Sequence, residues 1–197
     1  MASHSSKYRV ETRTAKEEIA CYAGELLHRM ISAYILNKRQ LVKKLWVEWN
    51  RDPLLYNKLW FTTRLANMAS FLRDVDYDQI LSEVSVEVNY TMASGKRSTF
   101  KGIIDCILLN SRTNEVCIVE WKSTLASASP LHEEQLQGYG QMVEINYLET
   151  PKLLLVYLDK GRVIQVENKS VIKDPWISVD NNPILMFLQK TDIVLDD

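Results

Sequence analysis

The stretch that most constrains the fold runs from Phe100 to Lys122 and has the pattern of a β-hairpin. Two apolar runs rich in β-branched residues, Phe100–Leu109 and Val116–Trp121, flank a polar segment, Asn110–Asn114. Runs of this length around such a turn are typical of two neighbouring antiparallel strands. The sequence therefore predicts a hairpin in the middle of the chain.

The middle of the turn, between Arg112 and Thr113, fixes the register of this hairpin. The opposed pairs that it predicts are Leu109 with Val116, Ile107 with Ile118, and Asp105 with Glu120. Opposed residues share a face of the sheet, and so do residues two apart, such as Glu120 and Lys122. We therefore expect Asp105, Glu120 and Lys122 to form one cluster on one face.

Opposed carboxylates repel each other, so this cluster favours a bound cation over a purely structural role. Carboxylates are hard oxygen ligands that suit Mg²⁺ or Mn²⁺. Such an ion lowers the pKa of a bound water and stabilises charge in a displacement at phosphorus, and a neighbouring lysine holds the water. An ordinary surface face of glutamate and lysine is the alternative.

The composition fits one globular domain spanning residues 1–197. Hydrophobic residues make up 46% of the 197 residues, charged residues make up 25%, and the net charge is −1. A nearly neutral chain lacks a global basic field, so any surface that binds nucleic acid must be local. No apolar run reaches the length of a membrane span. We expect no membrane partner.

Three cysteines, Cys21, Cys106 and Cys117, lack the spacing of metal ligands or of a disulfide framework. The hairpin register makes Cys106 and Cys117 diagonal neighbours, which predicts buried core thiols in an intracellular, reducing compartment. Residues Met1–Lys16 contain serine and arginine. A flexible tail is the favoured interpretation of this segment, and organelle targeting is the alternative.

Residues 14–72 predict a helical N-terminal region, which begins with the capping box Thr14–Glu17. Within its first helix, Gly24 and His28 lie four residues apart and so share a face. Because glycine inside a helix costs stability, Gly24 suggests a close packing contact. His28 alone would be interpreted as a partly buried histidine without a metal.

Residues 80–168 predict the sheet. A strand over Ile80–Tyr90 carries Glu83 and Glu87 on one face. A helix starting at Pro130 leads to a strand at Lys152–Leu158, and Val163–Glu167 pairs with that strand. A strand–helix–strand crossover implies a mixed sheet. We expect an α+β fold with about five central strands flanked by helices, and a terminal helix over residues 180–190.

The order of these motifs resembles the PD-(D/E)xK nuclease superfamily, with Asp105, Glu120 and Lys122 as its D, E and K. Ile104 stands in place of the proline, at a position that varies in the superfamily. The sequences Gly24–His28 (GELLH) and Gln135–Tyr139 (QLQGY) resemble the GxxxH and QLxxY elements of its RecB-like exonuclease branch.

This resemblance implies a restriction-endonuclease-like core that binds one or two Mg²⁺ or Mn²⁺ ions. His28 and the Trp121 carbonyl would join Asp105 and Glu120 as ligands, and Glu83, or else Glu87, would assist. The resemblance gives Gln135 and Tyr139 a role in holding the substrate or orienting Lys122. Some relatives carry an iron–sulfur cluster on four cysteines, and three unclustered cysteines argue against one here.

The expected function is hydrolysis of phosphodiester bonds in DNA, as an exonuclease on single-stranded ends. One alternative is an RNA endonuclease of the cap-snatching type, whose sites also combine a histidine, acidic residues and a lysine. The other is a catalytically silent nuclease-fold module that docks protein or nucleic acid.

Overall fold

A computed structural model describes residues 14–51, 58–91, 97–124, 129–147, 150–169 and 175–176. The elements in these ranges are α1 (Ala15–Ile35), α2 (Arg39–Arg51), α3 (Lys58–Asp74), β1 (Gln79–Thr91), β2 (Arg97–Asn110), β3 (Glu115–Lys122), α4 (Pro130–Tyr147), β4 (Lys152–Tyr157), β5 (Arg162–Val166) and β6 (Pro175–Trp176). The expected helix over residues 180–190 lies outside the described residues.

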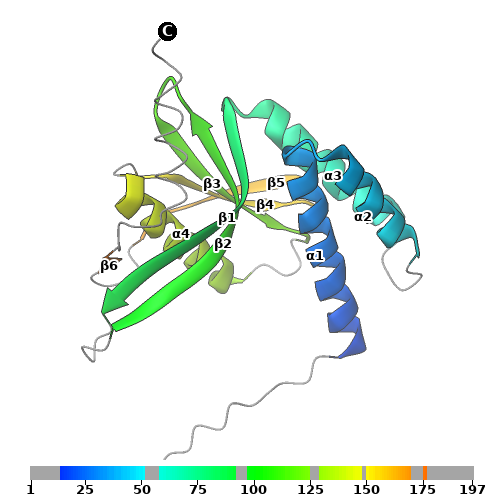
Figure 1. The fold of residues 1–197 in the computed structure, drawn as a ribbon, viewed down its shortest axis with the longest axis horizontal. Coiled ribbons are helices and arrows are strands. Elements are labelled where there is room, and N and C mark those ends of the chain that lie inside the picture. Colours follow the sequence, from blue (N-terminus) through cyan, green and yellow to red (C-terminus); the bar gives the residue numbers. More distant parts are fainter. Residues whose placement is uncertain are drawn as a thin grey trace, which may run out of the picture.

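Within the described part of the chain, the strands form one sheet in the order β5-β4-β3-β2-β1-β6 (Figure 1). Strands β3 and β4 run parallel, and the other neighbouring pairs run antiparallel. The predicted α+β fold with a mixed central sheet is confirmed. The short β6 adds a strand to the five expected, and β1 and β2 extend as a long ribbon away from α1–α3 (Figure 1).

The predicted hairpin register is confirmed. Leu109 pairs with Val116 and Ile107 pairs with Ile118. Cys106 lies opposite Val119 and Cys117 lies opposite Leu108, so the two thiols are diagonal neighbours, and both are buried.

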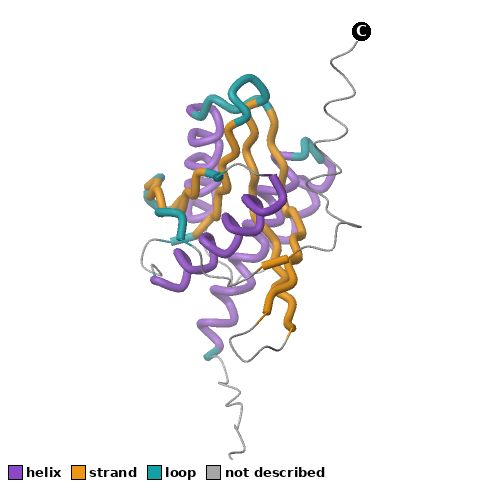
Figure 2. Tube along the Cα trace, turned by 90° about the vertical axis from the view of Figure 1, so that its left-hand side faces the viewer, coloured by secondary structure: helices purple, strands orange, loops and turns teal. Residues whose placement is uncertain are grey.

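Helices cover both faces of the sheet (Figure 2). On one face, α1, α2 and α3 bury a core with Cys106, Cys117 and Trp121 of the sheet. On the other face, α4 packs its Leu136, Tyr139, Met142 and Val143 against the strands. The capping box that opens α1 is present, because Thr14 Oγ1 accepts from the Glu17 N–H and Glu17 accepts from the Thr14 N–H.

The aromatic residues of α2 and α3 pack against one another. Trp49 stacks on Phe61 with ring centroids 4.3 Å apart and on Trp60 at 5.5 Å. Trp49 and Phe61 are both buried. These contacts favour a core role for the cluster over a stacking platform for nucleic acid.

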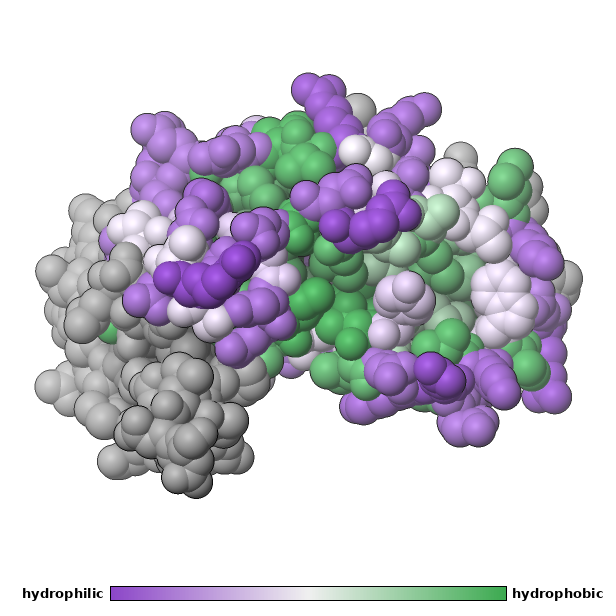
Figure 3. All heavy atoms as spheres, turned by 90° about the horizontal axis from the view of Figure 1, so that it is seen from above, coloured by the Kyte–Doolittle hydropathy of each residue, from purple (hydrophilic) through white to green (hydrophobic). Residues whose placement is uncertain are grey.

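In the view from above, hydrophilic side chains surround a broad area of apolar surface on the described part of the chain (Figure 3). The large apolar side chains that are most exposed among the described residues are Leu59, Leu131, Tyr34 and Ile103. None of the described helices combines the length and apolarity that crossing a membrane requires.

Gly102 of β2 makes room for an aromatic ring of α4. A Cβ built at Gly102 would lie 2.5 Å from Tyr139 Cε1, which is far inside van der Waals contact. The close approach lets α4 pack directly against β2.

We predict that Gly102→Ala lowers the free energy of unfolding by about 1–3 kcal/mol, because the added methyl group overpacks the contact with Tyr139. Denaturation in urea measures this. Gly24→Ala is the matched control, since a Cβ there meets nothing within 4 Å and should not destabilise the chain. Adding Tyr139→Leu should recover part of the loss, and equal stability of both alanine variants would contradict the prediction.

Candidate metal centre

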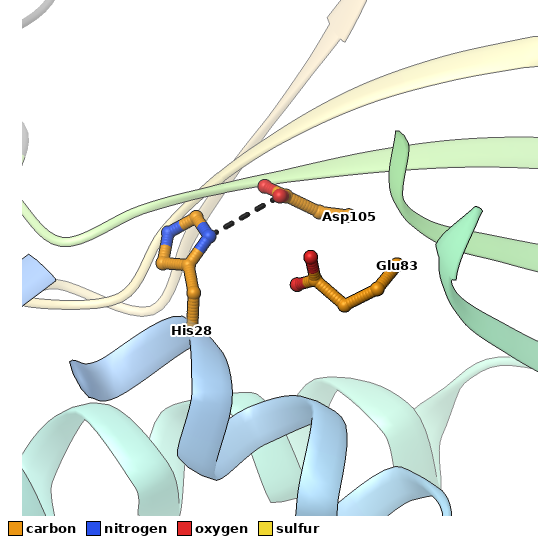
Figure 4. A group of neighbouring side chains, drawn as sticks. All are labelled: His28, Glu83 and Asp105. Atoms are coloured by element: carbon orange, nitrogen blue, oxygen red, sulfur yellow. Dashed lines mark hydrogen bonds and ion pairs between the residues drawn. The ribbon is translucent and has the colours of Figure 1, made fainter. Parts of the chain in front are cut away.

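Three predicted site residues from three elements converge at one point. His28 comes from α1, Glu83 from β1 and Asp105 from β2, and their side chains point toward one another (Figure 4). One ligand atom from each lies within 4.8 Å of those of the other two, and His28 Nδ1 is 3.2 Å from Asp105 Oδ1. This cluster, the His28–Glu83–Asp105 group, has the donor types that hold a divalent ion.

Glu83 reaches the group through an unusual backbone conformation. Its φ of +56° is left-handed, which costs a residue with a side chain about 1–2 kcal/mol. The β1–β2 ladder pairs Ser82 with Cys106 and Val84 with Ile104, and Glu83 and Asp105 stand opposite each other in the gap between these pairs. Strain of this kind is characteristic of functional sites. Glu87, the alternative to Glu83, instead forms an ion pair with Lys101.

The alternation of the two strands shifts by one residue at the same place. On the side of Glu83 and Asp105 nearer the β1–β2 turn, Val84, Val86 and Ile104 face the α4 core. On the other side of these two residues, Leu81, Ile107 and Leu109 face that core. The even-numbered residues of one half of the ribbon therefore share a face with the odd-numbered residues of the other. Glu83 and Asp105 stand where the two patterns meet.

Strands β2 and β3 separate just before the predicted carboxylate pair. Their last pair is Cys106 with Val119, so Asp105 and Glu120 lie one step beyond the ladder. The Trp121 N–H donates to Asp105 Oδ2 at 2.9 Å in place of a backbone carbonyl. The Asp105 carboxylate therefore lies in the gap between the strands, which differs from the single face that we expected it to share with Glu120 and Lys122.

The Trp121 carbonyl lies on the side of β3 that faces this gap. In a strand, the N–H and C=O of one residue point to the same side, and those of the next residue point to the opposite side. The Lys122 carbonyl accordingly points toward β4 and accepts from the Leu158 N–H at 2.8 Å. By this alternation the Trp121 carbonyl shares the side of its own N–H, which bonds to Asp105.

The other predicted residues form a chain of hydrogen bonds toward α4. Lys122 Nζ donates to Glu120 Oε1 at 2.7 Å and approaches Gln135 Oε1 at 3.5 Å. Gln135 Nε2 in turn donates to Tyr139 Oη at 3.0 Å. We call these four residues the lysine relay: Glu120, Lys122, Gln135 and Tyr139. Their hydrogen bonds hold the lysine amine in one position.

Glu120 is the residue that links the relay to the His28–Glu83–Asp105 group electrostatically. Its side chain is 5% exposed, and Oε2 is buried with no hydrogen-bond partner among the described residues. Burial, followed by repulsion from Asp105, raises the pKa of Glu120 to about 7, although Lys122 and His28 oppose the shift. A buried acceptor that lacks a partner beside other carboxylates is suited to a cation.

The pKa values of His28 and Glu83 are also raised. Burial lowers the pKa of His28, but the hydrogen bond to Asp105 and the surrounding carboxylates raise it above its ordinary value. Burial and then repulsion from Asp105 raise the pKa of Glu83. Folding therefore places several acids together without enough positive charge to balance them.

Sequence reasoning missed the part that α3 plays. Arg64 is buried, and its Nε donates to the Ser123 carbonyl at 2.7 Å, directly after Lys122. Its guanidinium also lies 3.9 Å from the Trp60 ring centroid. An arginine at helical spacing gives no sequence signal for such a contact, because its partner is a backbone carbonyl 59 residues away.

Gly24 does not make the close packing contact that we expected from its position inside α1. A Cβ built there meets no atom within 4 Å, so that expectation is wrong. The reason is that Gly24 faces a hollow rather than a neighbouring element.

Comparisons with known proteins leave the function open. No family model matches the chain, and no curated protein matches it. Among solved structures, the crystal structure of SSO0001 aligns with 92% of this chain and 84% of its own, at 16% identity and a TM-score of 0.38. Such values define neither a shared fold nor a shared function.

We predict that Glu83→Gly raises the free energy of unfolding of the metal-free protein by about 1 kcal/mol, since glycine accepts a positive φ and the substitution removes a repelled carboxylate. Urea denaturation in EDTA measures the change. Glu83→Gln removes the charge but keeps the strain, so it should give a smaller gain. A loss of stability in the glycine variant would contradict the prediction.

We also predict that the metal-free protein loses stability as the pH rises from 5 to 8. The pKa of Glu120 is about 7 in the folded state against an ordinary value of 4.5, so the folded protein binds more protons than the unfolded chain in this window. The raised pKa of His28 and Glu83 acts in the same direction. Thermal melts across the window should show a falling Tm, and Glu120→Gln should flatten the slope.

Proposed function

We propose that this chain is a metal-dependent nuclease that hydrolyses phosphodiester bonds in DNA, as an exonuclease on single-stranded ends. The observation that carries the proposal is the convergence of His28, Glu83 and Asp105 from three separate elements, with ligand atoms within 4.8 Å. The lysine relay lies beside this group, as a hydrolytic site at phosphorus needs.

The donor set fits Mg²⁺ or Mn²⁺. Carboxylate oxygens and a backbone carbonyl are hard ligands, and the imidazole favours Mn²⁺. His28, Glu83, Asp105, Glu120 and the Trp121 carbonyl would hold the ion, and the orphaned Glu120 Oε2 would gain a partner. When bound, the ion supplies a water of lowered pKa and offsets negative charge on the phosphate.

Lys122 would position the attacking water, and its positive charge would favour the hydroxide form of that water without accepting the proton itself. An ammonium group has three N–H donors, and the described residues account for two of them, directed at Glu120 and Gln135. The third can hold a water or a phosphate oxygen. Tyr139 holds Gln135 in place, so the relay keeps the amine aimed while substrate enters.

The nucleic-acid partner is supported by this chemistry rather than by net charge. With a net charge of −1, the chain has no global attraction for phosphate, so contacts must come from the site itself. Gln135, which is half-buried next to Lys122, would contact the substrate backbone, and the buried Tyr139 would act by holding Gln135. RNA is the second substrate to test, because a histidine with acids and a lysine also serves RNA endonucleases.

We predict that Asp105→Ala and Lys122→Ala each reduce cleavage by about two orders of magnitude or more, because each removes a group that acts on the reacting atoms. The assay follows end-labelled single- and double-stranded DNA and RNA, with and without Mn²⁺. Lys160→Ala, which removes an exposed lysine in the turn between β4 and β5, is the matched control and should keep full activity.

Circular dichroism checks that each variant is folded, and calorimetry with Mn²⁺ separates binding from catalysis. Asp105→Ala should lose Mn²⁺ binding, whereas Lys122→Ala should keep it. Full activity in either folded variant would refute the assignment. An absence of both cleavage and Mn²⁺ binding in the unmodified chain would favour a silent docking module instead.

A further inference from the structure

A hollow beside the metal centre has no role in the chemistry described so far. Its volume is about 550 Å³, within the range of pockets that hold small ligands. The residues that line it are Ala20, Cys21, Gly24, Glu25, His28, Arg29 and Glu83. Two of them, His28 and Glu83, belong to the His28–Glu83–Asp105 group, so the hollow opens directly onto the candidate metal centre.

The wall of the hollow on α1 is built from small residues. Ala20, Cys21 and Gly24 lie within about one turn of the helix, and a Cβ at Gly24 would meet nothing within 4 Å. Gly24 also has no positive φ that would require glycine. Neither packing nor backbone geometry explains why a glycine stands at position 24, although glycine weakens the interior of a helix. A need to keep the space in front of this position open does explain it.

The charges around the hollow decide which part of a nucleotide fits it. Glu25 and Glu83 are acidic, and the basic lining residues are already paired: Arg29 with Glu48 at 3.3 Å and His28 with Asp105 at 3.2 Å. A phosphate would therefore be repelled here unless an ion held it. A neutral ring that packs on small side chains and donates hydrogen bonds to a carboxylate has no such penalty.

We propose that this hollow is a nucleobase subsite, which receives the base next to the scissile phosphate while that phosphate lies at the metal centre. The inference rests on the proposed nuclease function. A base can enter only after leaving its stack, so the subsite favours single-stranded ends over an intact duplex. Gly24 is the specificity-determining residue, because any larger side chain there projects into the space of the base.

The test uses Gly24→Leu, with Gln40→Leu as the matched control. Leucine favours a helix more than glycine does, so Gly24→Leu should fold with an equal or higher Tm. Gln40 is exposed on α2 and lies outside the hollow, so its variant should cleave like the unmodified chain. The substrates are a single-stranded DNA oligonucleotide and the same oligonucleotide with one abasic position next to the cleaved bond.

For the unmodified chain, the abasic position should raise KM about tenfold, which is the size of effect expected when a base no longer buries apolar surface against small side chains. Gly24→Leu should raise KM on the normal oligonucleotide by a similar factor, with kcat within twofold and Mn²⁺ binding unchanged. On the abasic oligonucleotide the leucine should cause no further rise, because the base that it displaces is already gone. That non-additivity distinguishes a base subsite from a general loss of structure.

The experiment distinguishes a failure of the base subsite from a failure of the nuclease function. An unmodified chain that cleaves the oligonucleotide with the same KM with and without the base, and equally well with leucine at position 24, overturns the subsite and leaves the nuclease function standing. An unmodified chain that cleaves no nucleic acid in Mn²⁺ overturns both proposals. If Gly24→Leu loses its fold, Gly24→Ala replaces it, with a smaller rise in KM as the supporting result and an unchanged KM as the opposing one.

Discussion

Repulsion among the neighbouring carboxylates Glu83, Asp105 and Glu120 is the constraint that shapes the candidate site. Glu83, Asp105 and Glu120 stand close enough to raise the pKa of both glutamates, and one oxygen of Glu120 has no partner among the described residues. The fold tolerates this because the rest of the sheet is well paired and both of its faces are buried under helices. A chain selected only for stability would gain nothing from placing three carboxylates together, since burial and mutual repulsion oppose their charged forms.

The sequence was sufficient to predict the parts of the fold that depend on local pattern. The polar turn after Leu109 set the hairpin register, and the helix beginning at Pro130 required a crossover, so the mixed sheet followed. Site residues far apart in sequence were grouped only through motif order. The structure brings His28 to Asp105, 77 residues away, which no periodicity could have shown.

Other features depend on where strands stop pairing, which hydrophobic pattern alone does not reveal. Asp105 fills the gap between β2 and β3 because their ladder ends at Cys106, and the register alone placed it on the face of Glu120. One signal was present in the sequence. Ser82 and Glu83 are adjacent polar residues that interrupt the alternation of β1, and the strand changes face there. Gly24 was misinterpreted because glycine in a helix indicates missing volume without saying what occupies it.

The N-terminal helices are part of the site rather than an appendage to it. Helix α1 supplies His28, and α3 holds the ends of two strands, since Arg64 donates to the Ser123 carbonyl and Asn67 donates to the Leu158 carbonyl at 2.7 Å. These bonds hold the backbone just after the end of β3, next to Lys122, and just after the end of the neighbouring β4. Contacts from α3 as well as from α4 therefore determine the position of Lys122.

The parallel pairing of β3 and β4 has a consequence for how Lys122 is held. Two parallel neighbours cannot join by a tight turn, so β3 and β4 are joined by a long crossover that contains α4. Gln135 and Tyr139 are carried on that same helix, and Lys122 ends the strand that it connects. The position of the lysine amine therefore depends on the crossover helix as well as on the strand that carries Lys122. The hairpin alone, without α4, would lack the contact with Gln135 that helps to hold the Lys122 amine.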